Sequence, residues 1–166
     1  NSTETLPTEP PPTSSEPLTC RDEELLCVGL VTDVAGIDDK SFNQSAWEGV
    51  QRAEKDLAAR IEVIQSADAA QYTENIENFA QRDFDVIVTV GFNLQTSTIL
   101  AAQKYPNINF IGVDQDHSDI EQNVNLTGLI FSEKKAGFLA GALAAMVSNT
   151  GTVGAILGTD QVPPRS

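Results

Sequence analysis

Residues 28–47 read Val28-Gly-Leu-Val-Thr-Asp-Val-Ala-Gly-Ile-Asp-Asp-Lys-Ser-Phe-Asn-Gln-Ser-Ala-Trp47. They begin with a continuous apolar run, which is typical of a strand covered on both faces. A polar turn with three aspartates and one aromatic residue follows, and then an amphipathic helical pattern begins. Open α/β sheets bind ligands in such turns, beyond the carboxyl ends of their strands. The turn therefore predicts a site for a small molecule with a flat ring and polar hydroxyls.

Apolar runs and helical patterns continue to alternate along the rest of the chain. They recur roughly every 20–30 residues, which is typical of βαβ units with helices on both faces of a parallel sheet. The sequence thus predicts an α/β fold with a doubly wound parallel sheet. Strands are expected at 25–31, 61–66, 85–90, 108–113, 124–131 and 152–157, and helices at 41–60, 72–82, 95–104 and 133–147.

Composition divides the chain into three parts. Residues 1–24 are rich in Pro, Thr and Glu, and five of the eight prolines lie between Pro7 and Pro17. Such a segment buries too little apolar surface to repay the entropy of ordering, so we expect a disordered tether. Residues 25–158 form the predicted α/β domain, and residues 159–166 are a polar, Pro-rich tail.

Charge and hydropathy exclude some classes of partner. The 166 residues include 24 acidic and 10 basic side chains, for a net charge of −14. This charge repels phosphate backbones and anionic headgroups, so we expect no nucleic-acid partner. No apolar run approaches the ~20 residues of a membrane span. The chain begins at Asn1 and not at Met, which leaves open whether a leader has been removed.

The two cysteines, Cys20 and Cys27, are seven residues apart and have no histidine nearby. That spacing does not make a metal site. Two interpretations stay open. Cys27 begins an apolar strand and suits a small core residue, and a Cys20–Cys27 disulfide would close a short loop in an exported protein.

Polar and aromatic side chains follow three of the predicted strands, where the loops of a doubly wound sheet gather along one edge. Carboxylates accept hydrogen bonds from hydroxyls or ring N–H groups, an Asn side chain both donates and accepts, and a Phe face stacks on a flat heterocycle. The loops therefore predict a polar ligand, uncharged or cationic, with an aromatic portion. The candidate ligand-binding residues are Asp33, Phe42, Asn43, Gly91, Phe92 and Asp114.

Most of these residues also have a purely structural interpretation. Asp39 or Ser41 would cap the helix that follows the turn. Phe42 would act as a hydrophobic staple onto Ala46. Asn43 would be a surface residue in the first helical turn, Phe92 would close the sheet edge, and Asp114 would be an ordinary surface acid.

Signatures of catalysis are absent from the sequence. The lone histidine, His117, has no evident nucleophile nearby, and we expect it at the surface. The sequence contains no Gly-x-Ser-x-Gly elbow, no Walker A loop and no Gly-x-Gly-x-x-Gly after the first strand. We therefore expect no enzyme, no catalytic residue, no cofactor and no metal. The alternative in this class is a metal-dependent hydrolase lobe that uses Asp33, Asp38 and Asp39.

Several motifs resemble one family in the same order. They are the stretch from Val28 to Gly49 with its Asp39-Lys-Ser-Phe-Asn43 turn, Gly91-Phe92, Tyr105-Pro106 followed by Phe110-Ile-Gly-Val-Asp114, and Glu133-Lys-Lys-Ala-Gly-Phe-Leu-Ala-Gly-Ala-Leu-Ala-Ala145. Together they resemble the basic membrane protein family, the substrate-binding lipoproteins of ABC importers that are related to purine nucleoside receptor A. The resemblance covers residues 27–158.

The resemblance implies a type I periplasmic-binding-protein fold, of which this chain is the N-terminal lobe. Residues 159–166 would lead into a second lobe. Phe42 would stack on a base, Asp33 and Asn43 would line the pocket, Asp114 would accept hydrogen bonds from a purine, and residues 91–92 would form the pocket wall.

The function implied by the resemblance is the solute-binding component of an ABC importer, which binds a purine nucleoside without covalent chemistry. Its partners would be the ligand and a transporter permease. Its location would be extracytoplasmic, with a lipidated cysteine upstream of Asn1. The alternative is a sensory protein of the same fold for a sugar or another small ligand. A lobe without its partner lobe also exposes apolar surface, so self-association of the chain is a further expectation.

Overall fold

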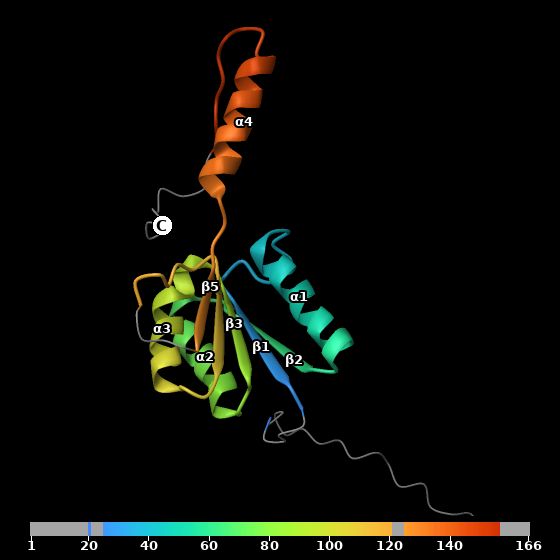
Figure 1. Ribbon diagram of the computed structural model, residues 1–166, viewed down its shortest axis with the longest axis vertical. Coiled ribbons are helices and arrows are strands. Elements are labelled where there is room, and N and C mark those ends of the chain that lie inside the picture. Colours follow the sequence, from blue (N-terminus) through green and yellow to red (C-terminus); the bar gives the residue numbers. More distant parts are fainter. Residues whose placement is uncertain (1–19, 21–24, 121–124, 157–166) are drawn as a thin grey trace, which may run out of the picture.

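The structure, a computed structural model, describes residue 20, residues 25–120 and residues 125–156. Five parallel strands form one sheet in the order β2-β1-β3-β4-β5 (Figure 1). The strands are β1 (Cys27–Thr32), β2 (Arg60–Gln65), β3 (Val86–Val90), β4 (Asn109–Val113) and β5 (Leu126–Leu129). The helices are α1 (Phe42–Leu57), α2 (Tyr72–Gln81), α3 (Gln95–Lys104) and α4 (Glu133–Val147), with 3-10 turns η1 (Ala69–Gln71) and η2 (Phe92–Leu94).

Helices cover both faces of the sheet, as the sequence predicts. Helix α1 covers one face, and α2 and α3 cover the other (Figure 1). Alternate strand residues supply the two apolar cores, because successive side chains of a strand point to opposite faces. Leu30 and Val113 pack on the α1 side, and Val31 and Phe110 pack on the α2–α3 side.

Strand β1 lies between β2 and β3. The chain therefore adds β2 on one side of β1, and then crosses over to add β3 on the other side. This reversal makes the carboxyl ends of β1 and β3 the topological switch point of the sheet. In open α/β sheets, ligands bind at such a point. The topology therefore directs attention to the turns that follow these two strands, which contain the residues singled out from the sequence.

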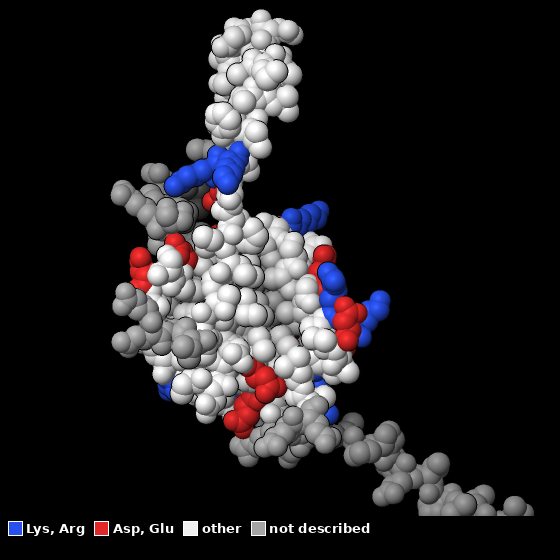
Figure 2. All heavy atoms as spheres, in the orientation of Figure 1, with Lys and Arg blue, Asp and Glu red and all other residues white. Residues whose placement is uncertain are grey.

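Helix α4 extends away from the sheet, beyond the carboxyl ends of the strands (Figure 1). None of its residues is buried, and apolar side chains such as Phe138 and Met146 are 74% and 84% exposed. Figure 2 shows basic side chains at the base of α4 and no charged side chain on the visible face above them. The predicted strand at 152–157 is wrong over its described part, residues 152–156, because the chain beyond α4 reaches no described strand with which it could pair.

Cys20 and Cys27 form a disulfide with their Cα atoms 6.0 Å apart. Cys27 is fully buried, so both interpretations left open by the sequence hold. The Cys20 N–H also donates to the Arg82 carbonyl at 2.9 Å. Because Cys27 begins β1, the disulfide lies at the end of the sheet opposite the switch point. The predicted tether, apart from Cys20, and the tail at 159–166 lie outside the described residues, and the domain boundary at 158 stays a prediction.

Within the described ranges, each helix is too short or too polar to cross a lipid bilayer.

Candidate ligand-binding site

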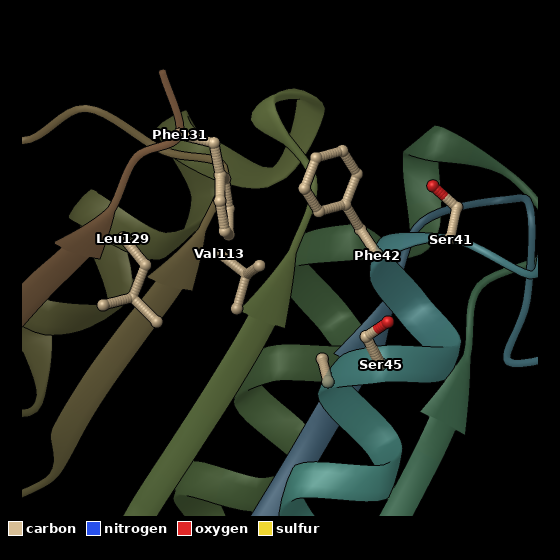
Figure 3. A pocket seen from close by; sticks show the side chains of 7 residues that line it. Ser41, Phe42, Ser45, Val113, Leu129 and Phe131 are labelled. Atoms are coloured by element: carbon tan, nitrogen blue, oxygen red, sulfur yellow. The ribbon is translucent and has the colours of Figure 1, made fainter. Parts of the chain in front are cut away.

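A hollow of about 380 Å³ lies on the α1 side of the sheet, where β4 and β5 end (Figure 3). The Phe42 side chain is half-buried, and its ring centroid lies 5.1 Å from that of Phe131. Val113 and Leu129, paired neighbours on β4 and β5, form the apolar floor. The hollow is therefore apolar, aromatic on one side and open to solvent. Its lining residues are Ser41, Phe42, Ser45, Ala46, Val113, Leu129 and Phe131.

The carboxylate of Asp39 holds the first turn of α1 in place, and Phe42 is the first residue of that helix. This carboxylate accepts the backbone N–H groups of Ser41, Asn43 and Gln44 at 2.8, 3.1 and 3.1 Å. Burial of the carboxylate raises the pKa of Asp39, but these hydrogen bonds outweigh burial and the pKa falls below its ordinary value. Asp39 is thus the residue that caps α1, whereas the Ser41 side chain makes no capping hydrogen bond.

Asn43 joins α1 to the end of β1. Its side chain is only 2% exposed, so the alternative of a surface residue is wrong. Its Nδ2 donates to Asp33 Oδ1 at 2.7 Å, and the same oxygen accepts the Ala35 N–H at 3.0 Å. Among the described residues, the buried Asn43 Oδ1 has no hydrogen-bond partner. A buried acceptor of this kind favours a donor group brought by a ligand or by water.

Gly91 brings the end of β3 close to this pair. Its φ of +100° is a conformation that glycine adopts without strain. A Cβ at this position would lie 3.3 Å from Asp33 Oδ2, so the missing side chain also allows the close approach. The Gly91 N–H donates to the Val113 carbonyl at 2.9 Å, which ties the turn to β4.

Asp114 follows Val113 and adopts φ +59°. Its N–H donates to the Leu129 carbonyl at 2.8 Å, and its carboxylate accepts no hydrogen bond from a described residue. Burial raises the pKa of Asp114, and the nearby Glu133 raises it further. The carboxylate therefore gains from any donor or cation that approaches it.

The structure brings Asp33, Asn43 and Gly91 together, and it places Phe42 in the hollow. Phe92 is half-buried in η2 and does not line the hollow.

Sequence reasoning missed Val113, Leu129 and Phe131 as lining residues. Val113 and Leu129 each lie at the end of an apolar strand, and this position could have indicated that they lie near a ligand site. Their pairing, however, depends on the strand order. Phe131 lies two residues beyond β5, so nothing in the sequence pattern indicates that it reaches Phe42.

His117 is not the surface histidine expected from the sequence. Its ring is partly buried, and its Nε2 lies 3.1 Å from Gln115 Oε1. Burial lowers the pKa of His117, although the neighbouring Asp116 raises it. The sequence did not predict the burial of His117, because this burial depends on how the loop after β4 folds back over the sheet.

The three aspartates of the turn do not form a metal site. Asp39 is used by backbone N–H groups, and Asp33 is used by Asn43 and Ala35. In the part of the chain that the structure describes, no three His, Cys, Asp or Glu side chains are grouped to hold a metal ion. The geometry gives the metal-dependent hydrolase alternative no support.

Residues 27–161 match the model of the Bmp family, described as ABC transporter substrate-binding protein PnrA-like. The chain belongs to this family. It is 36% identical over 137 residues to the ABC transporter nucleoside-binding protein BmpA of Lactococcus lactis subsp. cremoris, covering 80% of this chain and 38% of that protein. It is also 33% identical over 141 residues to an uncharacterised lipoprotein of Pyrococcus abyssi, covering 82% of this chain and 34% of that protein.

Among solved structures, an ABC transporter solute-binding protein from Aeropyrum pernix K1 matches with a TM-score of 0.68 and 27% identity. The match covers 75% of this Bmp-family chain and 34% of that protein. The fold is thus periplasmic-binding-protein-like. The chain spans less than two-fifths of the length of these relatives.

Proposed function

We propose that this chain supplies one wall of a binding site for a purine nucleoside-like ligand, in the solute-binding component of an ABC importer. The ligand binds without covalent chemistry. The observation that carries the proposal is the half-buried Phe42 ring, which lines an apolar hollow and is followed in the chain by Asn43, the hydrogen-bond partner of Asp33.

The aromatic side of the hollow suits a planar base. Stacking of a base on an aromatic side chain contributes about 1–3 kcal/mol and tolerates different bases. The hollow of about 380 Å³ also falls within the range of small-ligand sites, roughly 300–1,000 Å³. Phe42 supports base stacking, as the family resemblance implies.

Polar residues that follow two of the lining residues, Phe42 and Val113, suit the remaining parts of a nucleoside. Asn43 Oδ1 is a buried acceptor without a partner among the described residues, and the Asp114 carboxylate accepts no hydrogen bond from any of them. Ribose hydroxyls and the N–H groups of a base are donors of the kind these oxygens need. A ligand that pairs both oxygens gains the energy of two hydrogen bonds, one of them to a charged group.

The hollow is open to solvent, because Ser41, Ser45, Leu129 and Phe131 are exposed. Small-ligand sites usually enclose most of the ligand surface. We propose that a second lobe encloses the ligand in the complete protein, since the relatives are much longer than this chain. By itself, the 166-residue chain would bind nucleosides weakly, and a sub-micromolar dissociation constant for the chain alone would contradict this.

The experiment is a thermal-shift and calorimetric series on the complete gene product. Adenosine, guanosine and inosine are compared with ribose and glucose, each at millimolar concentration. We expect stabilisation by at least one nucleoside and none by the sugars. If only sugars stabilise the protein, the alternative of a sugar-sensing protein of the same fold replaces the nucleoside proposal.

The importer permease and a lipid anchor at the membrane belong to the same proposal. Their support is the family and the lipoprotein name of the Pyrococcus relative. Recovery of the protein in the detergent phase after expression from its own gene, and its release by substitution of a lipidated cysteine upstream of Asn1, would test the anchor. Sedimentation of the 166-residue chain would test the expected self-association, for which the exposed apolar side chains of α4 are the candidate surface.

A further inference from the structure

A second polar cluster lies on the α2–α3 face of the sheet, behind the candidate site. Its centre is Gln115, which is fully buried. The Gln115 Nε2 donates to the Thr89 hydroxyl at 3.1 Å and to the Gly91 carbonyl at 3.0 Å. The Gln115 Oε1 pairs with the Nε2 of His117. This amide therefore links the loop after β4 to the end of β3.

Two glycines make the room for this cluster. Gly112 on β4 and Gly128 on β5 are direct neighbours in the sheet. A Cβ on Gly112 would lie 2.6 Å from the His117 Nε2 and would also overlap Gln115 Oε1. A Cβ on Gly128 would overlap the backbone carbonyl of Gln115. Because the two glycines have no side chains, Gln115 and His117 can pack directly against the sheet.

The hydrogen bonds of this cluster all run in the same donor-to-acceptor direction. Both N–H groups of the Gln115 amide are used, so its oxygen must accept and His117 Nε2 must donate. On the other side, the Thr98 hydroxyl donates to the Leu94 carbonyl, which makes the Thr89 hydroxyl the donor to Thr98. The chain of hydrogen bonds runs from His117 through Gln115 to α3 and ends at the last residue of η2.

These donor and acceptor assignments fix the protonation state of His117. With its proton on Nε2, the ring is neutral, and its buried Nδ1 has no partner among the described residues. A second proton, on Nδ1, would be a buried donor without an acceptor, and burial of such a donor is unfavourable. The charged group that faces the ring is Asp116, whose carboxylate accepts the Ser118 N–H at 2.9 Å. Burial outweighs this charge and keeps the ring neutral.

We infer that Gln115 is the positioning residue of the candidate site, that it holds the Gly91 turn against Asp33, and that neutral His117 holds the Gln115 amide in the orientation required. The inference rests on the proposed function for its effect on ligand affinity. Its effect on the Gly91 turn does not depend on any ligand. Protonation of His117 would add a buried N–H at Nδ1 without an acceptor, and relief of this cost by movement of the ring would loosen the turn and weaken ligand binding together.

The first test is Gln115→Glu, which removes both amide donors without changing the shape of the side chain. Its matched control is Gln103→Glu, the same charge change on the exposed side of α3. We expect amide hydrogen exchange of residues 91–94 to accelerate at least about tenfold in Gln115→Glu and to stay unchanged in Gln103→Glu. Nucleoside affinity of the complete gene product should fall by a similar factor. Unchanged exchange at residues 91–94 overturns the inference.

The second test needs no disruptive variant. Because the pKa of His117 is lowered, exchange of residues 91–94 in the unsubstituted protein should accelerate relative to that of α1 only as pH falls below 6.5, after correction for the intrinsic pH dependence. His117→Asn should remove this difference, because the variant does not titrate. A profile that stays flat down to the pH at which the protein unfolds contradicts the role of His117.

The two proposals fail separately. A protein that binds no nucleoside overturns the proposed function, while exchange at residues 91–94 still decides the role of Gln115. A protein that binds nucleoside with equal affinity before and after Gln115→Glu overturns the positioning role and leaves the proposed function intact.

Discussion

The rings of Phe42 and Phe131 lie with their centroids 5.1 Å apart and their planes tilted by 49°. Phe42 begins α1, and Phe131 follows β5 at the other side of the hollow (Figure 3). A tilted pair at this separation is a favourable aromatic arrangement. The contact positions Phe42 from outside its own helix, so the aromatic wall of the hollow depends on two distant parts of the chain.

Phe42→Ala should weaken nucleoside binding by the complete gene product about tenfold to a hundredfold, because stacking on an aromatic ring contributes about 1–3 kcal/mol. Phe131→Ala should weaken binding less, since Phe131 is 52% exposed and acts mainly by supporting Phe42. Isothermal titration calorimetry measures both. Phe84→Leu, a conservative change in the opposite core, is the control for general loss of stability. Equal affinity before and after Phe42→Ala would remove the aromatic wall from the proposal.

Asn43→Asp should destabilise the protein more than Asn43→Ala at pH 7. The new carboxylate would lie beside Asp33, with which Asn43 is hydrogen-bonded at 2.7 Å. Two neighbouring carboxylates raise each other's pKa, so the folded state binds protons more readily than the unfolded state. The penalty is therefore present at neutral pH and shrinks as pH falls through the raised pKa values.

Urea unfolding of the two Asn43 variants at pH 7 and pH 4 measures the difference. Asn107→Asp is the control, because Asn107 is exposed. A penalty in Asn43→Asp that is the same at both pH values would show that charge repulsion with Asp33 is not its cause.

The sheet and its helices could be predicted because each element has its own periodicity. The helices at 95–104 and 133–147 agree with α3 and α4, and the expected strands from 25 to 131 correspond to β1–β5 within a few residues. The sixth strand failed for a physical reason. Val153 and Ile156 have an apolar strand pattern, but a strand forms only where a neighbour supplies its hydrogen bonds. Among the described residues, no strand pairs with this segment.

The candidate site was less predictable than the fold. The proximity of Asp33, Asn43 and Gly91 could be predicted because the loops after parallel strands meet at one edge, and this argument needs only the strand ends. Burial of Asn43 and His117 could not be predicted, since it depends on what folds over them. The enclosure of His117 rests on Gly112, and a glycine in a strand does not reveal which side chain will occupy its space.

Asp39→Ala should reduce stability by about 1–2 kcal/mol, in the upper part of the range for a helix cap, because three N–H groups at the start of α1 lose their acceptor. The folded-state pKa of Asp39 is lowered, so its contribution is present above its ordinary pKa and is lost as pH falls through the folded-state value. The stability difference between the unsubstituted protein and Asp39→Ala should therefore shrink below about pH 4. Asp38→Ala, at the exposed neighbour, is the control in chemical denaturation at both pH values. If Asp38→Ala costs as much as Asp39→Ala, the assignment of the cap is wrong.

Reduction of the Cys20–Cys27 disulfide should lower stability without altering the candidate site. The loop closed by the disulfide is short, and the chain-entropy relation gives a contribution of about 2.5 kcal/mol for it. The disulfide lies at the amino end of β1, whereas Asp33 follows its carboxyl end, so the hydrogen bond from Asn43 to Asp33 should persist. Urea unfolding with and without a reductant should show the loss in the unsubstituted protein, and Cys20→Ser should be equally unstable in both conditions. Hydrogen exchange at the start of α1 provides the site readout under native conditions. An increase there on reduction, as large as the increase at β1, would mean that the two ends of the sheet are coupled and that the disulfide also supports the site.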